Sequence, residues 1–248
     1  MSSRLEKAQL TASEMAHVTT SQIFCIGSNF AKITYYTFDI SFQRTSCKWM
    51  ITKRYSEFYT LRIALKNLLK QETKRNIRCL KAYLPLKLVD EAITSTFPRK
   101  HFRKDNGAII EERRVALESF VQSLVKVMYS FPPDFDKKEN TLSNLHNLLK
   151  TFLSFPEEQL HLNNKRTLAI LALEDVVVES STNMVKNESI EMDCCSICLG
   201  GWNEEEYADM RIVKLPCNHA FHEECVMEWL HGSAECPLCR SEPIPNPQ

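Results

Sequence analysis

The chain has 248 residues, of which 44% are hydrophobic and 25% charged, and only 5 are glycine. This composition is typical of a globular protein with one or two domains, and it excludes a fibrous, collagen-like or wholly disordered chain. The net charge of zero conceals an asymmetry, because residues 1–150 sum to +11 and residues 151–248 to −11. Such asymmetry predicts two units with different partners.

Hydrophobic periodicity predicts strands first and helices later in the basic half. Alternating apolar residues predict a strand over residues 31–42, and a second strand covers residues 49–54. Apolar residues at helical spacing then predict helices over residues 57–70, 109–128 and 142–152. Strands followed by helices favour an α+β domain.

The intervening segments are less regular. We expect a flexible polar tail over residues 1–18, a solvated basic stretch over residues 70–81 and an apolar, loop-forming segment over residues 84–97. Residues 156–192 have a linker-like composition, with a short helix or strand over residues 168–178 as an alternative.

No stretch approaches the ~20 apolar residues that span a bilayer, and the first 20 residues contain no apolar segment typical of a secretory signal. We therefore expect a soluble, cytoplasmic protein, in which a disulfide framework is disfavoured. Seven of the ten cysteines lie between Cys194 and Cys239. A local cluster of this kind predicts a metal site.

Eight soft ligands form four pairs within 45 residues, spaced as C-x2-C, C-x-H-x2-H-x2-C and C-x2-C. They are Cys195, Cys198, Cys217, His219, His222, Cys225, Cys236 and Cys239. Zn²⁺ takes four such ligands in a closed tetrahedral structural site, so the pattern predicts two structural zinc ions. Cys194 is an alternative first ligand, and reduced core thiols with a surface histidine pair are the alternative to a metal site.

This pattern resembles a RING finger of the H2 type over about residues 193–242. The resemblance implies a cross-brace arrangement of the eight residues around two ions. One ion is held by Cys195, Cys198, His222 and Cys225, and the other by Cys217, His219, Cys236 and Cys239. It also implies a ubiquitin-protein ligase that binds a ubiquitin-charged conjugating enzyme and has no catalytic nucleophile of its own.

By the same resemblance, Ile197, Trp229 and Pro237 contact the conjugating enzyme. Arg240 is then the linchpin that touches both ubiquitin and the conjugating enzyme. An exposed apolar patch is typical of a binding surface, and a guanidinium fork suits bridging carbonyl groups. The alternatives are that Trp229 packs inside the domain and that Arg240 is a solvated charge.

Two motifs in the basic half indicate an anion site: RYSEF at residues 54–58 and ERR-x2-LE-x-F at residues 112–120. Four of the six residues from Arg99 to Lys104 are also basic. An arginine beside an aromatic ring suits a phosphorylated sugar-like ring. These motifs resemble a phox-homology (PX) domain over about residues 19–155. The resemblance implies binding of phosphatidylinositol 3-phosphate on endosomal membranes.

Position by position, the PX resemblance assigns the 3-phosphate to Arg54, ring stacking to Tyr55, the 1-phosphate to Lys100 and the 4- and 5-hydroxyls to Arg113. The resemblance also assigns bilayer insertion to the apolar segment over residues 84–97. Between Arg54 and Lys100 the chain is longer than in most of the family, which leaves three alternatives to Lys100: Arg99, Arg103 and Lys87. Pairing of Arg54 and Arg113 with Glu57 or Glu111 is the alternative to lipid binding.

The predicted order is a tail over residues 1–18, a PX domain over 19–155, a linker over 156–192, a RING finger over 193–242 and a tail over 243–248. The predicted function is a ubiquitin ligase peripheral to endosomal membranes. The alternative is a non-enzymatic zinc-binding adaptor of the sorting-nexin type. Nucleic acid is disfavoured as a partner, because the basic side chains lack interleaved exposed aromatic residues. The sequence does not identify the ubiquitylated substrate.

Overall fold

The computed structural model describes residues 4–7, 9, 16–27, 32–42, 47–75, 83–95, 97–101, 105–132, 141–176, 194–202 and 211–243. The chain divides into two compact units. The first unit comprises residues 9–160, and the cysteine-rich unit comprises residues 1–8 and 161–248. Among the described helices, none has both the length and the apolar character that crossing a membrane requires.

The first unit is built on a three-stranded antiparallel sheet of β1 (Ala16–Ile26), β2 (Ile33–Phe42) and β3 (Lys48–Arg54), in that order. β2 and β3 agree with the two predicted strands. In β2, Phe38 pairs with Thr20 on one side and Ile51 on the other. β1 was not predicted, because its polar residues, most of them exposed, hide the alternation of buried Ala16 and Val18.

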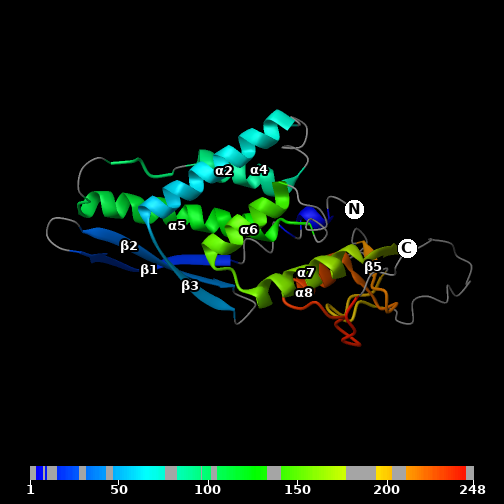
Figure 1. Cartoon of the computed structure of the whole chain (residues 1–248). Coiled ribbons are helices and arrows are strands. Elements are labelled where there is room, and N and C mark those ends of the chain that lie inside the picture. The colour runs from blue at the N-terminus through cyan, green and yellow to red at the C-terminus, as the bar shows by residue number, and fades with distance from the viewer. Residues whose placement is uncertain are drawn as a thin grey trace, which may run out of the picture. The chain divides into compact units, whose positions relative to one another are not determined.

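Four helices follow among the described residues of this unit, and Figure 1 shows them on one side of the sheet. They are α2 (Tyr55–Arg75), α4 (Leu84–Thr94), α5 (Gly107–Tyr129) and α6 (Thr141–Leu153). The three predicted helices lie within α2, α5 and α6. The predicted basic stretch begins in the last turns of α2, and residues 76–82 lie outside the described residues.

Helix α4 occupies the segment that the sequence predicted as an apolar loop. Leu86, Val89 and Ile93 recur at helical spacing and are buried, while Pro85 lies in the first turn, where a missing backbone N–H costs nothing. Burial of these side chains against the core stabilises this segment as a helix.

The core of the first unit joins the sheet to the helices. Phe58 of α2 is fully buried and meets Phe38, Phe120 and Phe152 edge to face, with ring centroids 5.7, 6.5 and 5.1 Å away. Edge-to-face pairs add about 0.5–1.5 kcal/mol each beyond burial. These contacts fix the position of the residues that start α2, including the RYSEF motif.

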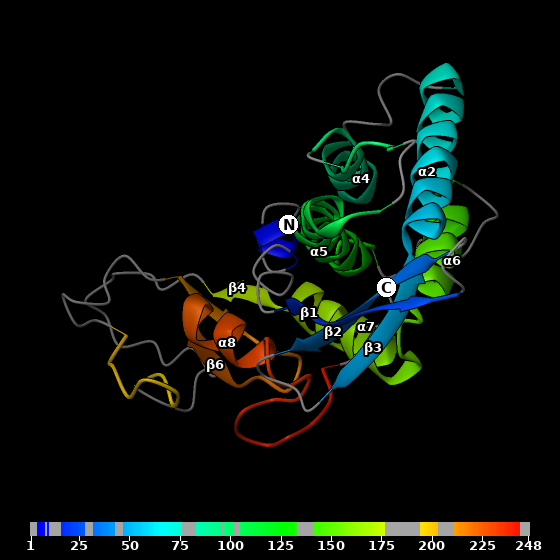
Figure 2. The same cartoon turned by 90° about the vertical axis from the view of Figure 1, so that its left-hand side faces the viewer.

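In the cysteine-rich unit, α7 (Glu157–Leu171) enters from the first unit. A second antiparallel sheet follows, made of β4 (Glu174–Val176), β5 (Ile212–Lys214) and β6 (Ala220–His222), and then α8 (Glu223–Leu230). Figure 2 shows α8 beside β4 and β6. The segment predicted as a linker therefore contains α7 and β4, and residues 177–193 lie outside the described residues.

Two further segments contribute to this unit. Ala169 and Ile170 of α7 pack with Phe221 and Val226. Arg4, in the segment predicted as a flexible tail, donates its Nε to Glu223 Oε1 at 2.5 Å, bonds the carboxylate of Asp175, and donates Nη1 to the Leu173 carbonyl at 3.2 Å. Arg4 thus connects α8 to β4.

Candidate functional site

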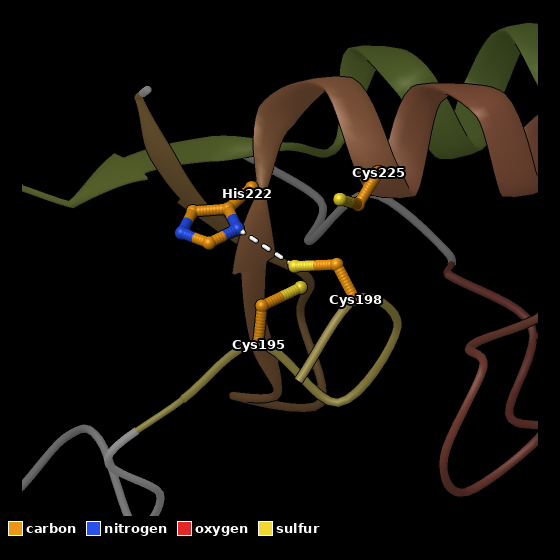
Figure 3. A group of neighbouring side chains, drawn as sticks. All are labelled: Cys195, Cys198, His222 and Cys225. Atoms are coloured by element: carbon orange, nitrogen blue, oxygen red, sulfur yellow. Dashed lines mark hydrogen bonds between the residues drawn. The ribbon is translucent and has the colours of Figure 1, made fainter. Parts of the chain in front are cut away.

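The first ligand group brings together residues from a loop, a strand and a helix. Cys195 and Cys198 lie on one tight loop, His222 ends β6, and Cys225 lies on α8, with all four side chains directed toward one another (Figure 3). Their ligand atoms lie within 4.8 Å of one another. The Cys198 Sγ and His222 Nδ1 are 3.2 Å apart.

The second group consists of Cys217, His219, Cys236 and Cys239, again with ligand atoms within 4.8 Å of one another. His219 Nδ1 lies 3.3 Å from the Cys217 Sγ and 3.6 Å from the Cys236 Sγ. Each group takes one Cys-x2-Cys pair and one pair from the central segment. The two groups are interleaved along the chain, which is a cross-brace.

The two Cys-x2-Cys pairs share one backbone geometry. The residue after each pair has a positive φ, 63° at Leu199 and 56° at Arg240. The Leu199 N–H donates to the Cys195 carbonyl at 2.7 Å, and the Arg240 N–H donates to the Cys236 carbonyl at 3.0 Å. This conformation is uncommon outside glycine. Its recurrence at matching positions indicates two knuckles shaped to aim both thiols at one ion.

The residues fit zinc. Each group offers three thiols and one imidazole, the donor set of a closed structural zinc site. Burial, and then the neighbouring Cys195, raise the pKa of the Cys225 thiol to about 12, and burial raises the pKa of Cys236 to about 12. A divalent cation favours the thiolate, so such clusters release protons when they bind metal. Cys194 belongs to neither group, and its backbone pairs with Gly201.

The predicted conjugating-enzyme residues differ in exposure. Trp229 is 41% exposed, and its Nε1 donates to the Glu235 carbonyl at 2.9 Å, next to the second knuckle. Ile197 is half-buried against the core, Pro237 is half-buried, and Arg240 is exposed. Trp229 therefore does not pack inside the unit.

Two apolar residues of the knuckles were missed by the sequence reasoning. Leu199 is 76% exposed and Leu238 is 41% exposed. Leu199 directly follows the first Cys-x2-Cys pair, and Leu238 lies within the second. These positions in the motif could have identified both residues from the sequence. They extend the apolar surface that the knuckles present.

In the first unit, two of the four predicted lipid-binding residues, Lys100 and Arg113, lie over neighbouring tyrosines, and one of these tyrosines is the predicted Tyr55. The Arg113 guanidinium carbon lies 4.0 Å from the Tyr55 ring centroid, and Lys100 Nζ lies 5.4 Å from that of Tyr59, one turn further along α2. The Tyr55 hydroxyl donates to the Pro98 carbonyl at 3.0 Å, which holds the segment before Lys100 against α2. The ring that was predicted to stack on inositol thus contacts Arg113.

Arg113 is 5% exposed and pairs with a carboxylate that the sequence reasoning missed. Its Nη1 donates to Asp105 Oδ1 at 2.7 Å, and the Thr34 hydroxyl donates to Asp105 Oδ2 at 3.0 Å. Glu111, the alternative partner, instead pairs with Arg114 at 2.7 Å. No sequence motif points to Asp105, because its contact with Thr34 depends on the fold.

Arg54 lies at the end of β3 and is exposed. Its backbone N–H donates to Glu57 Oε2 at 2.9 Å. The residue also lines a cleft of about 320 Å³ between α2 and α6, whose walls include Leu61 and Phe152. Of the alternatives to Lys100, Arg99 and Lys87 are exposed, and Arg103 lies outside the described residues.

Residues 193–240 match the Ring finger domain family, and residues 43–131 match the PX domain family. The chain therefore contains a PX domain followed by a RING finger with two Cys/His clusters suited to two zinc ions. No described feature of the fold conflicts with this assignment.

Curated relatives are similar to part of the chain. It is 43% identical over 63 residues to the putative RING-H2 finger protein ATL71 of Arabidopsis thaliana, and this match covers 25% of this chain and 30% of that protein. It is 36% identical over 88 residues to the E3 ubiquitin-protein ligase ATL59 of Arabidopsis thaliana, a match that covers 34% of this chain and 37% of that protein. It is 39% identical over 66 residues to the E3 ubiquitin-protein ligase RNF181 of Rattus norvegicus (27% and 38%). The chain spans less than half the length of each of these relatives.

Proposed function

We propose that this protein is a RING-type ubiquitin-protein ligase whose PX domain recruits it to phosphoinositide-containing endosomal membranes. The observation that carries the proposal is the pair of complete, interleaved four-ligand groups, with Trp229 and Arg240 exposed beside the second knuckle. Two of the similar proteins are named E3 ubiquitin-protein ligases, which supports the same activity here.

The proposed contribution to catalysis is orientation. The reactive group is the thioester of the conjugating enzyme, and the RING finger holds ubiquitin in a near-attack arrangement. Trp229 offers a rigid aromatic anchor, the residue type most enriched among interface hot spots. Arg240 offers five donors in a planar fork that suits carbonyl groups of ubiquitin and of the conjugating enzyme.

Autoubiquitination with purified activating enzyme and a panel of conjugating enzymes tests the ligase. Arg240→Ala retains a side chain with a Cβ, so the cost of the positive φ is unchanged, and we expect normal zinc content with most activity lost. Arg211→Ala removes an exposed cation of the same unit and keeps activity. Activity of Arg240→Ala equal to wild type would remove the linchpin role. No ubiquitin chains with any conjugating enzyme would instead favour a non-enzymatic adaptor.

The proposed lipid site consists of cationic residues of the first unit. Arg54 binds the 3-phosphate of phosphatidylinositol 3-phosphate, Lys100 the 1-phosphate, and Arg113 the 4- and 5-hydroxyls. The gathering of Tyr55, Lys100 and Arg113 supports this arrangement. The excess of cations adds a nonspecific attraction of about 1 kcal/mol for each cation near an anionic membrane.

Flotation with phosphatidylcholine vesicles, with and without phosphatidylinositol 3-phosphate, tests this part. We expect the protein to float only with the phosphorylated lipid, and Arg54→Ala to abolish flotation. Lys66→Ala is the control, because it removes an exposed cation of the same unit, on α2, and has no assigned role. Flotation that survives Arg54→Ala unchanged contradicts the proposed phosphate ligand.

A further inference from the structure

A carboxylate, that of Asp105, contacts the cluster that Tyr55, Tyr59, Lys100 and Arg113 form in the first unit. Asp105 is bonded through both oxygens, Oδ1 to the Arg113 guanidinium at 2.7 Å and Oδ2 to the Thr34 hydroxyl at 3.0 Å. Thr34 lies on β2 and is buried, so the sheet itself holds the carboxylate in place. A fixed carboxylate is unexpected at a site proposed to bind phosphate, because the two negative charges repel each other.

We propose that Asp105 is a specificity-determining residue that restricts the site to an inositol headgroup with hydroxyl groups, not phosphates, facing Arg113. The inference rests on the proposed lipid binding and assigns a function to a residue outside the two motifs. A fixed carboxylate accepts hydrogen bonds from hydroxyl groups. The same carboxylate repels a phosphate, because like charges placed side by side in a binding site are strongly unfavourable.

The environment of Arg113 supports this role. Arg113 is 5% exposed, and its guanidinium lies over the Tyr55 ring. The guanidinium therefore has little freedom to turn away from Asp105. Asp105 offsets its charge at 2.7 Å. Arg113 therefore adds little net positive charge for an additional phosphate, although its guanidinium still donates hydrogen bonds. Rejection of the wrong ligand by an unfavourable charge is a general route to specificity.

The test compares vesicles that contain phosphatidylinositol 3-phosphate with vesicles that contain the 3,4- or 4,5-bisphosphate, using the full zinc-loaded chain. Asp105→Asn removes the charge and keeps the size, and the Thr34 hydroxyl can accept a hydrogen bond from the amide. We expect its preference for the monophosphate over the bisphosphates to fall about tenfold, with binding of the monophosphate changed less than about threefold.

Two controls separate charge from structure. Asp39→Asn makes the same change of net charge on β2, outside the cluster, and we expect it to keep the wild-type preference. Thr34→Val keeps the charge of Asp105 and its bond to Arg113 but removes one of its two contacts, so we expect a smaller loss of preference than in Asp105→Asn. Circular dichroism and zinc content verify that each variant is folded.

Three results would overturn the inference while lipid binding stands. The first is a lipid preference of Asp105→Asn equal to that of Asp39→Asn. The second is an equal loss of binding to all the lipids in Asp105→Asn. The third is a loss of preference in Thr34→Val as large as that in Asp105→Asn. The last two results would assign Asp105 to the positioning of Arg113 or to local packing. If wild type binds no phosphoinositide vesicle, the proposed lipid function fails, and the role of Asp105 fails with it.

Discussion

The two units of this chain are stabilised in different ways. In the first unit, buried aromatic residues such as Phe38, Phe58 and Phe120 join a sheet to four helices. In the described part of the cysteine-rich unit, the buried cluster contains one aromatic residue, Phe221, and includes the ligand-group residues Cys195 and Cys236. A small unit with so few large apolar side chains needs another source of stability, and a structural metal is one.

This difference determines where each site lies. In the cysteine-rich unit the proposed metal ligands are part of the core, so the metal sites and the fold depend on each other. In the first unit the cluster of Tyr55, Lys100 and Arg113 lies at the edge of a core that is complete without a ligand. We therefore expect changes in the two units to have separable effects.

Zinc removal has the largest expected effect. A strong chelator should unfold the cysteine-rich unit, because structural zinc contributes on the order of 10–16 kcal/mol per site in model peptides. The first unit should keep its helical circular dichroism and its own thermal transition. Metal analysis should find two zinc ions per chain before treatment. Cooperative unfolding of both units on chelation would show that the two units are not stabilised independently.

The same experiment has a pH dependence. Protons compete with zinc for Cys225 and Cys236, whose pKa is raised to about 12 by burial and, at Cys225, by the neighbouring Cys195. Zinc binding at neutral pH therefore releases protons, and the apparent zinc affinity falls as the pH is lowered. Zinc titrations at pH 6 and at pH 8 measure this change in apparent affinity. An affinity independent of pH would mean that the thiols do not bind the metal.

Removal of a central side chain from the first unit is the converse change. Phe58→Ala leaves a cavity between the sheet, α2, α5 and α6, and large-to-small changes of this kind cost about 3–5 kcal/mol. We expect a lower midpoint of urea unfolding for this unit, with two zinc ions still bound. If Phe58→Ala lost its zinc at urea concentrations where the wild-type protein keeps it, the two units would not be stabilised independently.

The features that the sequence predicted correctly are those with a local pattern. Strand β2 alternates apolar and polar side chains, and each knuckle needs only two cysteines with a two-residue spacer. Helix α4 was missed because its apolar segment was interpreted as a loop, although its buried residues recur at helical spacing and Pro85 is compatible with a first turn. β1 was missed because the apolar half of its pattern is short.

The features that the sequence did not predict depend on residues far apart in the chain. Asp105 binds Thr34, 71 residues earlier, and Arg4 binds Glu223, 219 residues later. No spacing rule relates such positions, because the fold alone brings them together. The interleaving of the two ligand groups is also non-local, and it was predicted from the family resemblance.

Arg4→Ala tests how far the N-terminal segment contributes to the cysteine-rich unit. The Arg4 side chain is 13% exposed, and it bonds Glu223 and Asp175, whose side chains are 19% and 64% exposed. The more exposed partner is screened by solvent, so we expect a cost of about 1 kcal/mol. At that cost, zinc release to a chelator becomes roughly fivefold faster, because 1.4 kcal/mol corresponds to a factor of ten. An unchanged rate would show that the segment is not part of the unit.

The smallest expected effect belongs to a surface pair of the same unit. Lys165 Nζ lies 2.5 Å from Glu242 Oε1, but both side chains are more than one third exposed, at 38% and 49%. Exposed pairs of this kind contribute about 0.2–1 kcal/mol, because water screens the charges and long side chains lose freedom when they pair. At the low end of this range, about 0.2–0.4 kcal/mol, Lys165→Ala should change the rate of zinc release by less than about twofold. If Lys165→Ala instead accelerated zinc release as much as Arg4→Ala, the burial of Arg4 would not explain the size of its contribution to stability. The N-terminal segment would then be one of several interchangeable surface contacts.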